Sequence, residues 1–217
     1  MSQITVVTTF HADGMRKYGQ RFIDSFIQKV DKRITLLVYA EECAPYISNN
    51  QQVTLLNANI ELPKLIAFKE KWKNDPKANG DISSIPRLAG RKDRHKPFKW
   101  DAVRFSHKVY SIFHCAKTSG TDLLLWMDAD MVCHSDIDYD TILKLCPADK
   151  DLCFLGRKGK FSECGLYAMN LQSQPTQQFL KDFQMFYDDA ENGIFRLGEW
   201  HDSFVFDAVR KNHKLRE

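Results

Sequence analysis

Apolar residues come in short runs along the first sixty positions. Three of these runs are rich in β-branched and aliphatic residues and predict strands: ITVVTTF (4–10), which we expect to be buried, ITLLVYAE (34–41) and VTLLNA (53–58). Residues 15–30 instead carry Tyr18, Phe22, Phe26 and Val30 at intervals of four, which places them on one face of a helix. A strand, a helix and a strand joined by short connections indicate a parallel sheet with covering helices.

The second half of the chain continues this alternation. Helical spacing or composition predicts helices at 100–117, 140–146, 176–190 and 199–213, and apolar runs predict strands at 123–127, 151–157 and 164–171. The run LLLWM at 123–127 has no polar position, which is typical of a strand buried on both faces. We therefore predict one α/β domain over residues 1–217, Rossmann-like, with a mostly parallel central sheet flanked by helices.

One long segment interrupts the pattern. Residues 74–97, NDPKANGDISSIPRLAGRKDRHKP, are rich in Gly, Pro and charge and predict a surface loop. The formal net charge is only +3, but residues 64–108 contain 13 Lys and Arg against 5 Asp and Glu. This excess favours an anionic ligand, such as a diphosphate or a nucleic acid. A solvated lysine-rich surface explains the same composition equally well.

Compartment signals are few. No apolar run approaches the length of about 20 residues that a membrane span needs. The first ten residues lack the basic and apolar regions of a signal peptide, so we expect a cytoplasmic protein. None of the six cysteines forms a C-x-x-C pair, which favours reduced, mostly buried thiols over a zinc site or a disulfide framework.

Two carboxylates follow the most apolar strand. Asp128 and Asp130 come directly after LLLWM, separated by one alanine. In an open parallel sheet, ligands gather beyond the carboxyl ends of the strands. Two carboxylates this close need a countercharge, which a divalent Mg²⁺ or Mn²⁺ ion supplies while substrate phosphates and water complete its shell. The alternative is a pair of solvated aspartates in a turn.

The stretch LLLWMDADMV resembles the D-x-D strand of GT-A-fold glycosyltransferases. Other segments resemble parts of that fold in the same order: TVVTTF with its helix, RFSHKVYSIFHCAK, FSECGLYAMNL and EWHDSFVFDAV. The resemblance spans most of the chain in architecture, although only Asp128 and Asp130 are specific. It implies a metal-dependent enzyme that moves a sugar from a nucleotide sugar, such as a UDP-sugar, to an acceptor hydroxyl.

The resemblance also implies residue roles. Asp130, and less directly Asp128, would bind the metal and the ribose-diphosphate. The end of the first strand would contact the base and ribose, through Thr8, Thr9 and Phe10. One basic residue would face the diphosphate, chosen from Lys99, Arg104 and Lys108. The donor sugar would lie beside Glu163, Cys164 and Gly165, where the glycine allows a close backbone approach.

On the acceptor side, the resemblance makes Asp202 the candidate base, with His201 beside it. Helix capping is the other common role for an aspartate at this position. Members of the superfamily often have a third metal ligand, usually a late histidine, and here only His201 and His213 are available. The metal site is therefore incomplete on sequence grounds. An inverting reaction would need the base, a retaining one would not, and the sequence fits both.

Other functions compete with a glycan, lipid or protein acceptor. A nucleotidyltransferase also uses a parallel sheet and metal-binding carboxylates, but its first loop is typically glycine-rich, and HADGMRK has one glycine. A non-catalytic nucleic-acid-binding protein would explain the basic segment but not the D-x-D strand. A glycosyltransferase acting on modified bases in viral DNA would explain both, because KPFKWDAVRFSHK interleaves cations with aromatic residues.

Overall fold

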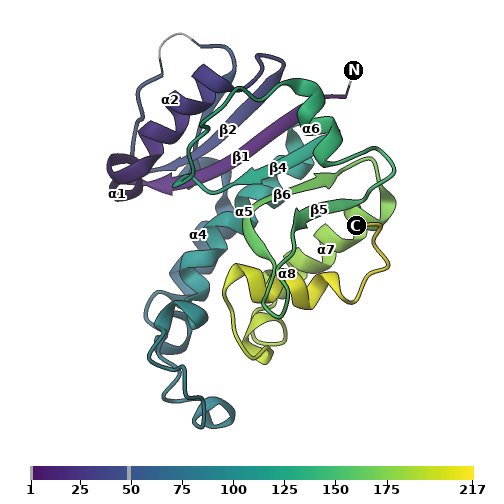
Figure 1. Cartoon of the computed structure of the whole chain (residues 1–217). Helices are drawn as coiled ribbons and strands as arrows, with labels where there is room; N and C mark the ends of the chain where they lie inside the picture. The colour runs from purple at the N-terminus through teal and green to yellow at the C-terminus, as the bar shows by residue number, and fades with distance from the viewer. Residues whose placement is uncertain (1, 48–49) are drawn as a thin grey trace.

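A six-stranded mixed sheet forms the centre of the protein in the computed structural model, which describes residues 2–47 and 50–217 (Figure 1). The strands lie in the order β3-β2-β1-β4-β6-β5. Their bounds are β1 Ile4–His11, β2 Ile34–Glu41, β3 Val53–Asn57, β4 Leu123–Met127, β5 Leu152–Leu155 and β6 Glu163–Asn170. The pairs β3/β2, β2/β1 and β1/β4 are parallel, and β6 runs antiparallel to both β4 and β5. The predicted α/β fold with a mostly parallel sheet is confirmed.

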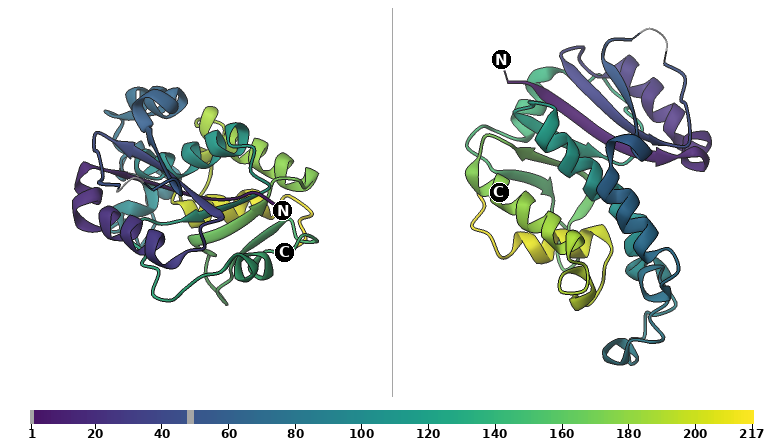
Figure 2. Two further views of the ribbon diagram at one scale, coloured as in Figure 1. Left: turned by 90° about the horizontal axis from the view of Figure 1, so that it is seen from above. Right: turned by 180° about the vertical axis from the view of Figure 1, so that it is seen from behind.

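Helices cover both faces of this sheet (Figure 2). The helices are α1 Ala12–Gly14, α2 Gln20–Lys29, α3 Ala58–Glu61, α4 Pro63–Trp72, α5 Ala102–Thr118, α6 Tyr139–Leu145, α7 Gln174–Asp188 and α8 Asp202–Arg210. Side chains of β4 alternate between two cores: Leu123, Leu125 and Met127 pack with α2 and α6, whereas Leu124 and Trp126 pack with α4, α5, α7 and α8. Because both faces are covered, every residue of β4 is buried and apolar.

The helix predicted at 15–30 is confirmed with one irregularity. Its first turn, Met15–Gly19, is a π-helix that continues directly into α2. Phe22 and Phe26 are fully buried, as their spacing predicts. Gly19 lets the helix approach β1 closely, since a Cβ there would lie 2.9 Å from the ring of Phe10. Helices α3 and α4 were not predicted from the apolar pattern.

The segment from 74 to 97 projects away from the sheet beyond α4 (Figures 1 and 2), and we call it the basic projection. It contains no α-helix or β-strand, as predicted, but three 3₁₀ turns each begin with a proline: Pro76–Ala78, Pro86–Leu88 and Pro97–Trp100. It is also packed, because Ile82 and Leu88 are buried. Among the described residues, no helix combines the length and apolar character required to cross a membrane.

Candidate functional site

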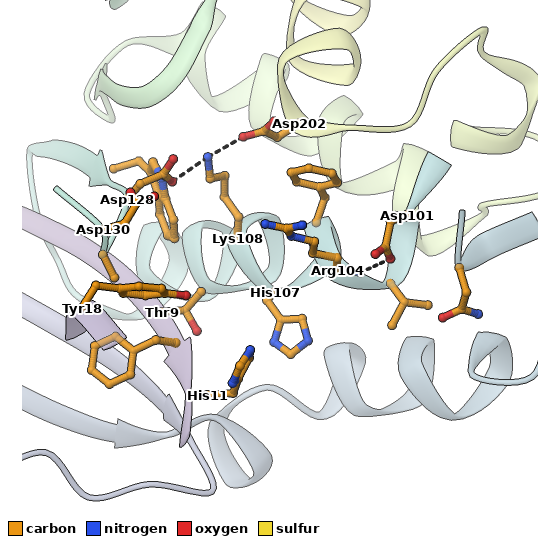
Figure 3. Close-up of a pocket in the computed structure, with 16 residues that line it drawn as sticks. Thr9, His11, Tyr18, Asp101, Arg104, His107, Lys108, Asp128, Asp130 and Asp202 are labelled. Atoms are coloured by element: carbon orange, nitrogen blue, oxygen red, sulfur yellow. Dashed lines mark hydrogen bonds and ion pairs between the residues drawn. The ribbon is translucent and has the colours of Figure 1, made fainter. Parts of the chain in front are cut away.

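A cavity of about 600 Å³ opens at the carboxyl edge of the parallel strands (Figure 3). The end of β1 lines one side through Thr9, Phe10 and His11, and the turn after β4 lines another through Asp128 and Asp130. Helix α5 contributes Arg104, His107 and Lys108 to the wall, and α8 contributes its first residue, Asp202. The position agrees with the rule that ligands bind beyond the carboxyl ends of parallel strands.

Lys108 is the buried centre of this wall. Its ammonium lies 2.8 Å from Asp128 Oδ1, donates to Asp202 Oδ2 and donates to the carbonyl of Cys164 at 2.8 Å. Burial alone would lower the pKa of Lys108, but the carboxylates of Asp202 and Asp128 outweigh burial and raise it above the usual lysine value. Because an ammonium has three protons, these three acceptors occupy all of them.

Asp202 is the first residue of α8, and the helix cap is its neighbour His201, whose Nδ1 accepts from the N–H of Phe204 at 3.4 Å. Asp202 Oδ1 accepts from the N–H of Ser203 at 2.8 Å. Burial would raise the pKa of Asp202, but Lys108 and His201 lower it well below the usual range. Asp202 is therefore ionised at neutral pH, and its role as an acceptor base stays a prediction.

Asp128 and Asp130 offer different environments to a cation. Asp128 Oδ1 accepts from Trp126 Nε1 at 2.6 Å in addition to facing Lys108. Asp128 Oδ2 and the exposed carboxylate of Asp130 have no hydrogen-bond partner within the described chain. Free oxygens on two neighbouring carboxylates beside a cavity fit Mg²⁺ or Mn²⁺, which need few protein ligands when phosphates and water supply the rest. No group of three potential ligands exists over residues 2–47 and 50–217. His201 and His213 are instead held by Glu199 and Asp182.

The three candidates for contact with a diphosphate differ sharply. Lys99 does not line the cavity, because its ammonium binds Asp93 at 2.7 Å and Glu199 at 3.1 Å. Lys108 is buried and fully hydrogen-bonded. Arg104 is exposed and lines the cavity, and its guanidinium has no carboxylate partner in the described part of the protein. The geometry thus leaves Arg104 as the cation free to meet a diphosphate.

Three residues at the end of β1 were predicted to contact the base and ribose, and two of them line the cavity. Thr9 and Phe10 line it, although the Thr9 hydroxyl already donates to the carbonyl of Tyr39 at 2.8 Å. Thr8 does not line the cavity, and its buried hydroxyl has no hydrogen-bond partner among the described residues. Phe10 also packs against Gly19 of the first helix, so its ring serves the core as well as the cavity.

The residues predicted beside the donor sugar lie next to the cavity rather than in its wall. Gly165 accepts the N–H of Asp128 at 2.8 Å through its carbonyl. A Cβ on Gly165 would lie 3.5 Å from Asp128 Oδ2 and from Glu163 Oε1, which is ordinary contact, so the protein itself does not require glycine here. The Glu163 carboxylate binds Arg157 at 2.8 Å.

The structure adds residues that the sequence did not single out. His107 lines the cavity, and its Nδ1 lies 3.2 Å from Glu41 Oε2. Burial lowers the pKa of His107 to about 4, more than Glu41 raises it, so the imidazole is neutral near pH 7. Trp126 orients Asp128, a contact that alternation along a strand could have indicated, because positions two apart share a face. Tyr18 and His11 complete the wall near Asp130 and the end of β1.

Three solved structures of glycosyltransferases share this fold. The bifunctional glycosyltransferase WbbM has a TM-score of 0.54 and 12% identity, over 96% of this chain and 37% of WbbM. GlyE from Streptococcus pneumoniae TIGR4 has a TM-score of 0.52 and 9% identity, over 97% of this chain and 44% of GlyE. Mouse xyloside xylosyltransferase 1 has a TM-score of 0.50 and 10% identity, over 97% and 82% of the two chains. This chain therefore has a GT-A-like glycosyltransferase fold.

The GT-A-like fold is shared at low sequence identity. The chain spans less than half the length of WbbM and of GlyE. No protein-family model matches the sequence, and no curated protein sequence matches it significantly. The chemistry of this protein must therefore be inferred from the residues that line its cavity, and not from sequence similarity.

Proposed function

We propose that this protein transfers a sugar from a nucleotide sugar to an acceptor hydroxyl. The observation that carries the proposal is a convergence of charged groups on a cavity at the carboxyl edge of β1 and β4. These groups are Asp128 Oδ2, the carboxylate of Asp130 and the guanidinium of Arg104, and none of them has a partner among the described residues. A metal-bound diphosphate needs carboxylate oxygens on one side and a cation on the other. The GT-A-like fold of the chain supports the same reading.

The reaction breaks the bond between the anomeric carbon and a diphosphate oxygen. The bonding electrons leave with the diphosphate, and the acceptor oxygen forms the new bond to the anomeric carbon. Asp128 and Asp130 would hold a divalent cation, which neutralises the leaving group when bound. Arg104 adds a positive charge that is already in place beside the cavity, and such preorganised charge is usually the largest catalytic contribution.

Asp202 is proposed to receive the proton of the acceptor hydroxyl. Its low pKa makes it a weak base, but the hydroxyl becomes strongly acidic as its oxygen bonds to the anomeric carbon. A carboxylate that stays ionised is then sufficient, and Lys108 keeps Asp202 in that state. Lys108 acts as a positioning residue, because it fixes Asp202 and Asp128 relative to one another and has no proton free for the substrate.

A thermal-shift panel of nucleotide sugars, with and without Mn²⁺, tests the proposal directly. A ligand that binds the folded state alone increases the free energy of unfolding by RT ln(1 + [L]/Kd) and thereby raises Tm. A 100-fold excess over Kd adds about 2.7 kcal/mol of stability. We expect at least one nucleotide sugar to raise Tm in the presence of Mn²⁺. The stabilising donor is then followed for release of its nucleoside diphosphate. A panel without any stabilising nucleotide sugar would contradict the proposed function.

A further inference from the structure

The outer part of the basic projection presents cations that the protein does not neutralise. Lys92, Arg94 and Lys96 are exposed, and the described residues place no carboxylate within ion-pair distance of them. Two other cations of the same segment do have carboxylate partners. Arg91 and Lys99 both bind Asp93 and the buried Glu199, so their charge is balanced.

The projection is fixed to the body of the protein rather than free in solution. Arg87 donates to the carbonyls of Phe195 and Leu197, the latter at 2.7 Å. Trp100 donates to the carbonyl of Gly198 at 3.0 Å. The charged tip is therefore held at a defined position beside the segment that leads into α8.

A second loop carries further unbalanced cations. The connection between β5 and β6 contains Arg157, Lys158 and Lys160, all exposed. Arg157 binds Glu163 at 2.8 Å, whereas Lys158 and Lys160 have no carboxylate partner within residues 2–47 and 50–217. Phe161 follows Lys160, and its ring lies close to the imidazole of His201.

Aromatic rings join the two basic segments around His201. The ring of Phe98 lies 6.2 Å from the imidazole, that of Phe161 lies 5.6 Å away and that of Phe105 lies 6.3 Å away, measured between centroids. Phe98 is 44% exposed, so its ring is open to solvent. Phe105 lines the cavity, and so does Asp202, the residue after His201. The rings therefore connect the two basic segments with the wall of the cavity.

We propose that this surface binds single-stranded nucleic acid and presents it to the cavity as the acceptor. The basic–aromatic surface consists of the cations Lys92, Arg94, Lys96, Lys158 and Lys160 and the ring of Phe98. Cations along a surface neutralise successive phosphates, and an exposed ring stacks on a base irrespective of sequence. The inference rests on the proposed function, since it names the acceptor for the same cavity.

Charge and shape favour this acceptor over the alternatives. A neutral glycan gains little from five cations left without carboxylates. An anionic membrane would use the cations, but it also needs a broad apolar face, and Phe98 is the one exposed large apolar side chain within the basic–aromatic surface. Unstacked bases use both the cations and the ring.

The test measures fluorescence anisotropy of a labelled oligonucleotide of about twenty nucleotides across a salt titration, without donor present. Four variants are compared. One removes the projection's charges (Lys92→Gln, Arg94→Gln and Lys96→Gln together), and a control removes three exposed lysines elsewhere (Lys144→Gln, Lys181→Gln and Lys211→Gln together). Phe98→Leu removes the aromatic ring while keeping an apolar side chain, and Phe98→Tyr keeps the ring. The Tm of each variant confirms that it is folded.

The projection variant should lose most of its affinity at low salt. Its slope of log K against log salt concentration should shrink by about 2, because each phosphate contact on a single strand contributes about 0.7. Phe98→Leu should weaken binding by about 5-fold or more, and Phe98→Tyr by less than about 2-fold. The lysine control should bind like the unmodified protein.

Several outcomes overturn the inference. One is the absence of oligonucleotide binding up to about 100 µM at low salt. Another is binding that Phe98→Leu leaves unchanged and that dextran sulfate reproduces, which would indicate a surface for any polyanion. Stronger binding to phosphatidylglycerol vesicles than to the oligonucleotide would assign the surface to a membrane. Donor binding in the thermal-shift panel is measured independently, so a nucleotide sugar that binds while the oligonucleotide does not overturns this inference and leaves the proposed function standing.

Discussion

The ammonium of Lys108 lies 2.8 Å from the carboxylate of Asp128, a residue twenty positions later in the chain. Lys108 comes from the buried face of α5, and Asp128 follows the last residue of β4. The same ammonium binds Asp202 at the start of α8. One buried cation therefore ties together three elements around the cavity, and several predictions concern this group and the free charges near it.

Replacing Lys108 should destabilise the fold. Lys108→Met leaves the largely buried carboxylate of Asp202, whose side chain is 15% exposed, without its countercharge. Breaking a buried ion pair on one side typically costs about 3 to 5 kcal/mol. Urea unfolding monitored by circular dichroism measures the loss. Lys144→Met, on the exposed face of α6, is the control and should change stability by less than about 0.5 kcal/mol. Equal stabilities of the two variants would mean that the ion pair has no structural role.

Removing Asp130 should abolish the effect of metal without affecting the fold. Asp130→Ala deletes an exposed carboxylate that has no partner among the described residues, so Tm without ligand should stay within about 1 °C. The additional Tm increase that Mn²⁺ gives to a bound nucleotide sugar should disappear. Asp149→Ala, another exposed aspartate, should retain it. Full donor turnover in EDTA would rule out the metal.

Arg104 should matter for catalysis more than for stability. Arg104→Gln removes the unpaired guanidinium from the cavity, and we expect kcat to fall about 10²-fold, the usual effect of losing one group that stabilises developing charge. Arg21→Gln, on the exposed side of α2, controls for the loss of an arginine elsewhere. Measuring kcat and KM separately is necessary, because a change confined to KM would assign Arg104 to donor binding alone.

Asp202→Asn should reduce transfer by about 10²-fold or more while donor affinity changes little. Asparagine keeps an oxygen that can accept hydrogen bonds, but it cannot take the acceptor proton. It also leaves Lys108 with one countercharge fewer, so a lower Tm should accompany the loss. Transfer rates come from single-turnover assays with saturating donor. A variant with near-native transfer would remove Asp202 from the reaction and favour a retaining mechanism.

His107 should make stability sensitive to mild acid. Its folded pKa is about 4 against a usual value of 6.5, because burial disfavours the imidazolium. The unfolded chain takes up a proton as pH falls below about 6.5 and the folded protein does not, so the free energy of unfolding decreases between pH 6.5 and 4. From pH 7 to 5 this contribution is about 2 kcal/mol. Urea unfolding at both pH values should show a smaller decrease in His107→Gln, and identical decreases would contradict the assignment.

The sequence by itself determined the architecture. The strands at 4–11, 34–41 and 123–127 follow from apolar or β-branched runs, because a strand covered on both faces has few polar positions. The strand at 53–57 follows from its composition alone, since most of this edge strand is exposed. The placement of Asp128 and Asp130 at the rim of a ligand cavity follows from the same physics, since a buried strand can end in charge only where it leaves the core. The loop at 74–97 follows from its glycines, prolines and charges.

Tertiary structure alone decided which charges are free. Lys99, Arg104 and Lys108 lie within ten positions, and the sequence does not distinguish their roles. In the structure, Lys99 binds Asp93 and Glu199, whereas Lys108 is buried against Asp128 and Asp202. Arg104 is exposed at the cavity. Their partners come from segments up to 100 residues away, and local spacing carries no information about such pairs. The pKa values of Asp202 and His107 have the same origin, because burial and the nearest charge exist only once α5, α8 and the sheet have packed together.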